Sequence, residues 1–153
     1  MIEDYYNRFY QRMFDRTHLL SENKFKTARE IARWKQKVIR GWESIEVVSV
    51  TVENPKKMLV IGDSFSVDIV LKMNELSAMD VGMEVLFGQI SEEEITHIAY
   101  KQEMKMVESD DNKVRFTCTI QSDSAGLFDY AFRVFPKNPL LPHRQDFNLI
   151  KWI

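Results

Sequence analysis

The chain has 153 residues, of which 44% are hydrophobic and 29% are charged, a composition typical of one globular domain rather than of a disordered segment. A formal net charge of −2 leaves no broad basic surface for a nucleic acid backbone. The longest apolar runs are also far too short for a membrane-spanning helix.

The N-terminus and the single cysteine indicate the compartment. Residues 1–5 are acidic and aromatic, which argues against a signal or transit peptide. Cys118 has no second cysteine to pair with, as expected in a reducing compartment. It lies in a run of alternating apolar residues, so we expect a buried structural thiol rather than a nucleophile. The sequence thus predicts a cytoplasmic protein.

The first 44 residues are typical of helices, because they contain no Pro and no Gly before Gly41. Bulky side chains recur every three or four residues over 4–20, which predicts an amphipathic helix. Residues 21–23 then indicate a break, with Asn23 as a candidate N-cap. A second apolar stripe runs from Phe25 to Trp42. We therefore predict a two-helix hairpin over residues 1–44.

This hairpin is too rich in aromatic residues to bury its own apolar face. We expect these side chains to cover the rest of the chain or a partner. The surplus is the first indication that the chain is a segment of a longer protein.

From residue 45 onward the hydrophobic period changes from about 3.6 to two. Alternating runs predict strands at residues 45–53, 64–73, 81–87, 97–106, 114–121 and 128–134, with a seventh if residues 147–152 pair. Turn-forming residues separate these runs, and no space remains for the helices that parallel strands would need. We predict an antiparallel, immunoglobulin-like β-sandwich of six to seven strands over residues 45–153.

The sequence offers little catalytic chemistry. His18, His97 and His143 lie in three different predicted elements, without the spacing of metal ligands. Phosphate-binding glycine loops and dinucleotide fingerprints are lacking as well. We accordingly predict no catalytic, cofactor-binding or metal-binding residue, and the sequence favours a binding or structural module over an enzyme.

Five stretches carry a more specific signal. They are residues 4–10 (DYYNRFY), 28–35 with 42–47 (AREIARWK and WESIEV), 81–88 (VGMEVLFG) and 132–141 (FRVFPKNPLL). In this order they resemble the C-terminal end of the bacterial and archaeal alpha-glucan phosphorylases, the relatives of glycogen and maltodextrin phosphorylase. The chain departs from the family pattern at Asn138, where histidine is frequent, and over residues 146–149.

The resemblance implies a non-catalytic C-terminal accessory domain of an enzyme that transfers glucosyl units between alpha-1,4-glucan and phosphate. In this family, pyridoxal phosphate is held by a lysine in the catalytic body. The motif of that lysine is not found in these 153 residues, so we expect no cofactor here. Residues 1–44 would then complete the catalytic body, while residues 45–153 would form an appended domain.

An alternative is a free-standing carbohydrate-binding module with an immunoglobulin-like sandwich. That hypothesis needs exposed aromatic side chains, but most aromatic residues of the predicted strands lie at positions that the alternation assigns to the buried face. Phe135 and Trp152 remain as candidate glucan contacts, although packing between elements is the commoner role of such residues. The expected partners are the remainder of the parent polypeptide, alpha-glucan and a second copy of the chain, without nucleic acid or membrane.

Overall fold

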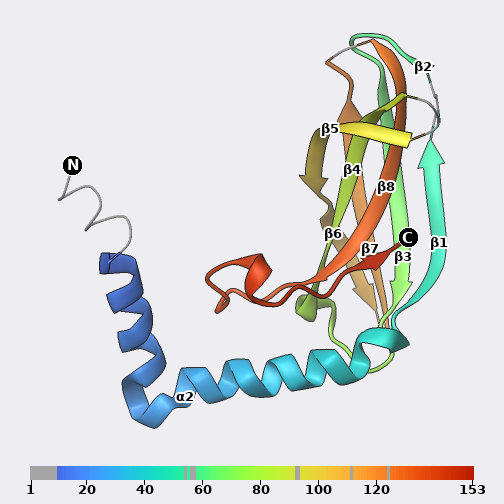
Figure 1. Ribbon diagram of the computed structural model, residues 1–153. Coiled ribbons are helices and arrows are strands. Elements are labelled where there is room, and N and C mark those ends of the chain that lie inside the picture. Colours follow the sequence, from blue (N-terminus) through green and yellow to red (C-terminus); the bar gives the residue numbers. More distant parts are fainter. Residues whose placement is uncertain (1–9, 54, 56–57, 92–93, 111, 124) are drawn as a thin grey trace. The chain divides into compact units, whose positions relative to one another are not determined.

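The computed structural model describes residues 10–53, 55, 58–91, 94–110, 112–123 and 125–153. In this part, a helix is followed by strands in antiparallel sheets (Figure 1). The chain divides into two compact units, residues 1–39 and 40–153. The prediction of a mainly β protein with an N-terminal helical part and antiparallel sheets is confirmed.

Helix α2 (Gln11–Gly41) contains a kink. Glu22 has an extended backbone, and the next three residues lie in the left-handed region, with φ angles of 48°, 56° and 61° at Asn23, Lys24 and Phe25. The predicted break falls at this kink. Asn23 does not have the extended backbone of an N-cap, however, and tolerates the left-handed conformation as asparagine often does. The two-helix hairpin is not confirmed, because these residues form a single kinked helix.

The first half of α2 leaves much of its apolar stripe uncovered. Tyr10, Met13 and Phe14 are 58%, 67% and 66% exposed. Residues 4–9, which carry the start of the predicted stripe and of the first motif, lie outside the described residues. The uncovered side chains agree with the surplus of apolar surface expected from the sequence.

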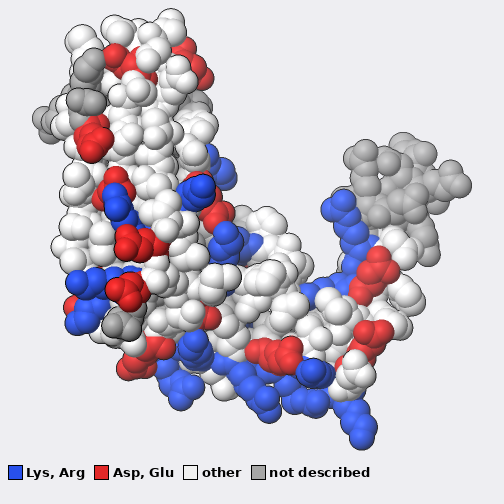
Figure 2. All heavy atoms as spheres, turned by 180° about the vertical axis from the view of Figure 1, so that it is seen from behind, with Lys and Arg blue, Asp and Glu red and all other residues white. Residues whose placement is uncertain are grey.

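Charge is distributed unevenly between the two units. Residues 1–39 contain nine Lys and Arg against five Asp and Glu, whereas residues 40–153 contain twelve against eighteen. Figure 2 shows Lys and Arg gathered along α2 and both signs mixed over the sheets. The β unit is therefore acidic overall, which opposes the approach of a polyanion.

The first sheet has the strand order β1-β3-β7-β6, with every pair antiparallel. Its strands are β1 (Glu46–Glu53), β3 (Ser64–Lys72), β7 (Lys113–Gln121) and β6 (Lys105–Asp110). Burial alternates strictly along β3 and β7, the two central strands, as the sequence predicts. The edge strands β1 and β6 are exposed over almost their whole length.

The second sheet has the order β2-β8-β4-β5, and β9 also pairs with β8. Its strands are β2 (Met58–Leu59), β8 (Gly126–Pro136), β4 (Val81–Ser91), β5 (Glu94–Glu103) and β9 (Lys151–Trp152). Short 3-10 turns lie at Trp42–Ser44 (η2), Ala78–Asp80 (η3) and Arg144–Asp146 (η4). Of the predicted strand at 147–152, only β9 forms.

Aromatic side chains join the two sheets in one core. The ring of Phe65 on β3 lies 5.8 Å from that of Phe87 on β4 and 5.7 Å from that of Tyr130 on β8. Phe87 stacks on Phe128 with ring centroids 4.6 Å apart. Because these side chains belong to different sheets, the sheets pack face to face, as the two layers of strands in Figure 1 show.

One predicted strand is wrong. The alternating run over residues 97–106 is not a single strand, because β5 ends at Glu103 in the second sheet and β6 begins at Lys105 in the first. Met104 lies between them, 3% exposed, with its amide donating to the carbonyl oxygen of Met83 at 2.8 Å. Alternation reports which face a residue occupies, but not which sheet its strand joins.

Candidate functional site

The outer face of the second sheet carries a row of polar and aromatic side chains. Cross-strand pairing places Glu84 of β4 beside Arg133 of β8, and Arg133 beside Trp152 of β9. On the other side, Glu84 is paired with Glu103 of β5. These four residues, which we call the outer row, bring together positions distant in the sequence because the antiparallel register is fixed across four strands.

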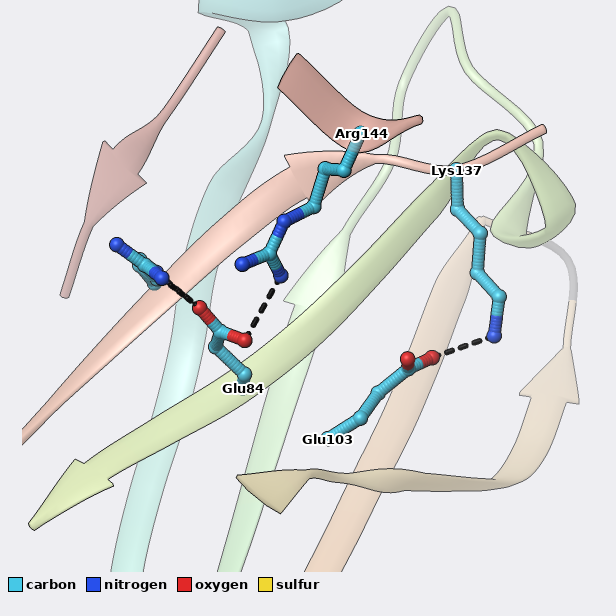
Figure 3. Close-up of polar contacts among 5 residues, drawn as sticks. Glu84, Glu103, Lys137 and Arg144 are labelled. Carbon is cyan, nitrogen blue, oxygen red and sulfur yellow. Dashed lines mark hydrogen bonds and ion pairs between the residues drawn. The ribbon is translucent and has the colours of Figure 1, made fainter. Parts of the chain in front are cut away.

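Glu84 is the centre of the row and is only 4% exposed. Its carboxylate accepts hydrogen bonds from Arg133 and, at 2.7 Å, from Nη1 of Arg144 in η4 (Figure 3). Burial alone would raise the pKa of this carboxyl, but the hydrogen bonds from Arg144 and Arg133, with their charges, outweigh it and lower the pKa. Glu84 is therefore a carboxylate held ionised between two guanidinium groups.

Phe135 fastens the C-terminal segment to the same face. Its ring lies over Gly82 of β4 so closely that a Cβ atom at position 82 would be 2.5 Å from Cζ of the ring. The guanidinium carbon of Arg144 lies 4.4 Å from the ring centroid, within the range of a cation–π contact. Arg144 thus joins the ion pair of Glu84 to the ring of Phe135.

A second ion pair extends the attachment. Lys137, just after β8, pairs with Glu103 of β5 (Figure 3), and the amide of Lys137 donates to the carbonyl oxygen of Asp80 at 2.9 Å. The side chains of this pair are 56% and 47% exposed, so it contributes much less than the buried pair of Glu84.

Beside the row lies a pocket of about 160 Å³. It is lined by Arg133, Phe135, Arg144, Gln145, Phe147, Asn148, Leu149 and Ile150. The lining combines apolar rings, amides and guanidinium groups, a mixture that suits a small polar ligand with apolar faces. A larger open groove of about 410 Å³ lies at β6, β7 and the turn between them, but none of the charged side chains that line it is buried.

The two aromatic residues singled out in the sequence both lie around Arg133. Phe135 is 5% exposed and lines the pocket, whereas Trp152 is 58% exposed. The guanidinium carbon of Arg133 lies 5.6 Å from the centroid of the Trp152 ring. Of the pair, only Trp152 presents a broad aromatic surface.

The histidines lie in different parts of the chain. His18 pairs with Glu22 at 3.0 Å on the exposed surface of α2, and Nδ1 of His143 accepts from the amide of Gln145 at 3.1 Å. The side chain of His97 lies outside the described residues. Over the described residues, no group of three or more His, Cys, Asp or Glu could hold a metal ion.

Cys118 is a buried structural thiol, as predicted, and is 6% exposed on β7. Burial and the nearby charge of Asp68 raise the pKa of the thiol to about 11. We expect Cys118 to react with a disulfide reagent such as DTNB at pH 8 on the order of a hundredfold more slowly in the folded chain than in denaturant, because so little thiolate is present. Equal rates in the two states would contradict the assigned burial.

The charged side chains of the outer row are engaged in ion pairs within the chain. The carboxylate of Glu84 is paired with the guanidinium groups of Arg133 and Arg144, and that of Glu103 is paired with Lys137. Within the described ranges, every buried side-chain nitrogen and oxygen has a hydrogen-bond partner. Nor is any described helix long and apolar enough to cross a membrane.

Sequence reasoning missed Glu84, Gly82 and Arg144. The alternating pattern of β4 assigned Gly82 and Glu84 to a solvent-exposed face, but that face is covered by Phe135 and Arg144. A signal was present in the sequence, because two of the five stretches that carry the family resemblance, residues 81–88 and 132–141, contain Gly82, Glu84, Arg133 and Phe135. Arg144 belongs to no motif, and its contact depends on the path of the irregular C-terminal segment.

Comparison with known proteins identifies the class of domain. The family model described as "Glycogen phosphorylase C-terminal domain" matches residues 42–153, and the chain therefore belongs to this family. The chain is 28% identical to the maltodextrin phosphorylase of Thermococcus litoralis, with 99% of the chain and 18% of that protein covered. It is 21% identical to the glycogen phosphorylases of Mycobacterium bovis and Mycobacterium tuberculosis, with 98% of the chain and 18% of each relative covered. The resemblance to alpha-glucan phosphorylases is confirmed, and the chain spans 18% of the length of these relatives.

Proposed function

We propose that the chain is a non-catalytic C-terminal accessory domain of an alpha-glucan phosphorylase. The observation that carries this proposal is the match to a phosphorylase C-terminal domain over residues 42–153, in a chain that corresponds to 18% of its relatives. The ion pairs of Glu84 with Arg133 and Arg144 also support it. These side chains bind one another and hold the C-terminal segment on the second sheet, so the most buried charged cluster of the described residues has a structural role.

The whole enzyme would transfer glucosyl units between alpha-1,4-glucan and phosphate, with its active site in the remainder of the polypeptide. Pyridoxal phosphate, whose aldehyde is held by the amine of a lysine and whose phosphate needs a cradle, does not fit the described residues. No lysine whose side chain is described is buried, and a desolvated amine is therefore lacking here. We assign the cofactor to the remainder of the enzyme and the whole protein to the cytoplasm.

We also propose that residues 45–153 form an immunoglobulin-like sandwich. The order β1-β3-β7-β6 matches strands A, B, E and D of one sheet of that fold. In the second sheet, where β2 and β9 both pair with β8, the path β9-β8-β4-β5 matches strands G, F, C and C′. Residues 1–44 would then belong to the edge of the catalytic body, where the apolar stripe of the kinked helix α2 would be covered.

Self-association is a further part of this proposal. The edge strand β1 exposes Val47, Val48 and Val50 by 44%, 49% and 42%, and its outer edge is unpaired among the described residues. An edge of this kind supports contact with the remainder of the polypeptide or with a second copy of the chain.

The proposal is tested by assaying the isolated chain and the full-length enzyme side by side. With maltoheptaose, phosphate and pyridoxal phosphate, we expect glucose 1-phosphate from the full-length enzyme only. The isolated chain should also show no absorbance from bound cofactor after dialysis. Release of glucose 1-phosphate by the chain alone would contradict a non-catalytic role.

A further inference from the structure

We propose that Trp152 and the adjoining pocket bind a glucose ring of an alpha-glucan chain. This inference rests on the proposed function, from which it takes the class of ligand, and it adds a specific site to it. The site consists of Trp152, the pocket beside Arg133, and the two exposed amide residues at its rim, Gln145 and Asn148.

Trp152 is held in place before any ligand arrives. It pairs with Arg133 in the β8–β9 ladder, and the next amide, that of Ile153, donates to the carbonyl oxygen of Phe132 at 3.0 Å. The guanidinium of Arg133 lies over the indole, yet the residue remains 58% exposed. A large aromatic surface that is fixed and exposed suits stacking against the apolar face of a pyranose, because little conformational entropy is lost on binding.

The pocket supplies the polar half of the recognition. A pyranose ring has apolar faces and a rim of hydroxyl groups that both donate and accept hydrogen bonds. Phe147 offers an apolar wall, whereas Gln145 and Asn148 carry exposed amides that can pair with neighbouring hydroxyls. Arg133 lines the pocket and its guanidinium lies over the indole of Trp152, so this residue is common to both parts of the proposed site.

The charge balance favours a neutral ligand over an anionic one. Arg133 and Arg144 both donate to Glu84, and Lys137 is paired with Glu103. The surrounding β unit carries more acidic than basic residues, which opposes the approach of an anion. The chemistry of the site is therefore that of a neutral sugar chain rather than of phosphate or a sugar phosphate.

The test is calorimetric titration of the 153-residue chain with maltoheptaose, with inorganic phosphate as a second probe. We expect saturable binding of maltoheptaose with a dissociation constant on the order of a millimolar. Trp152→Ala should weaken binding about fivefold or more, through loss of stacking. Asn148→Ala should weaken it as well, and this exposed position lies outside the ion pairs that hold the segment.

Tyr100→Ala serves as the matched control, because Tyr100 on β5 is also an exposed aromatic residue, at 47%, away from the pocket. It should leave binding unchanged. Circular dichroism melting of each variant verifies folding, and Asn148→Ala carries the test if Trp152→Ala does not fold. The proposal would be overturned if the folded parent chain did not bind maltoheptaose, if both site variants bound it as tightly as the parent chain, or if the chain bound phosphate instead.

Failure of this site would leave the accessory-domain proposal standing, since that rests on where glucose 1-phosphate is formed. Conversely, catalysis by the isolated chain would remove the accessory-domain proposal, whatever the titration showed.

Discussion

Glu84→Gln is expected to lower the free energy of unfolding by about 3 kcal/mol at pH 7, because it leaves two guanidinium groups without their buried carboxylate. The amide keeps the shape of the side chain, so the loss reports charge and hydrogen bonding rather than volume. Urea unfolding of the isolated chain, followed by circular dichroism, gives the measurement.

The pH dependence gives this prediction a second measurement. The pKa of Glu84 is lowered in the folded chain from an ordinary value of 4.5, so its contribution to stability is fully present above that value. It is lost as the pH falls through the lowered pKa. The difference between the parent chain and Glu84→Gln should thus be constant near neutrality and shrink below about pH 4.5.

Glu103→Gln is the matched control for Glu84→Gln. Its partner Lys137 and Glu103 itself are about half exposed, so the loss should stay below about 1 kcal/mol. If both variants lost the same stability, or if Glu84→Gln changed nothing, the central role assigned to Glu84 would be wrong.

Gly82→Ala should destabilise the domain by about 2 kcal/mol, although alanine is a minimal addition. The new methyl group would lie 2.5 Å and 2.7 Å from Cζ and Cε2 of Phe135, so the ring must move. Moving it also disturbs the contact of Arg144 with the ring. Urea unfolding of the variant measures the loss directly.

A double variant separates this steric clash from other effects at position 82. Phe135→Leu removes the ring atoms that the methyl group would meet, so Gly82→Ala in that background should cost less than about 0.5 kcal/mol, apart from the cost of Phe135→Leu itself. Additive losses would indicate that the ring and the glycine do not interact.

The sequence predicted most accurately where one face of a strand meets the core. Along β3 and β7, Phe65, Ile69, Phe116 and Ile120 are buried as their alternation predicts, because each strand has neighbours on both sides. The change of sheet at Met104 could not be predicted in this way. A methionine at an inward-facing position of the alternating pattern is expected to be buried in both cases, whether the chain continues in one sheet or crosses to the other.

The candidate site was predictable only in part. Trp152 and Phe135 stood out in the sequence as aromatics near the end of the chain, and the structure brings both to Arg133. Glu84 could not be predicted, because a charged residue in an alternating strand pattern gives the same sequence signal whether it is exposed or buried against partners from elsewhere in the chain. The contact with Arg144 spans 60 positions and depends on an irregular segment that has no periodic pattern.

The passage of the chain from one sheet to the other at Met104 ties the two layers mechanically. One sheet cannot separate from the other without moving Met104, because the chain crosses between the sheets there. The amide of Met104 donates to the carbonyl oxygen of Met83, one residue before Glu84. A disturbance on the outside of one layer is thus transmitted to the interior of both. The domain should therefore unfold as a single cooperative unit, so that loss of an ion pair in the outer row lowers the stability of every strand.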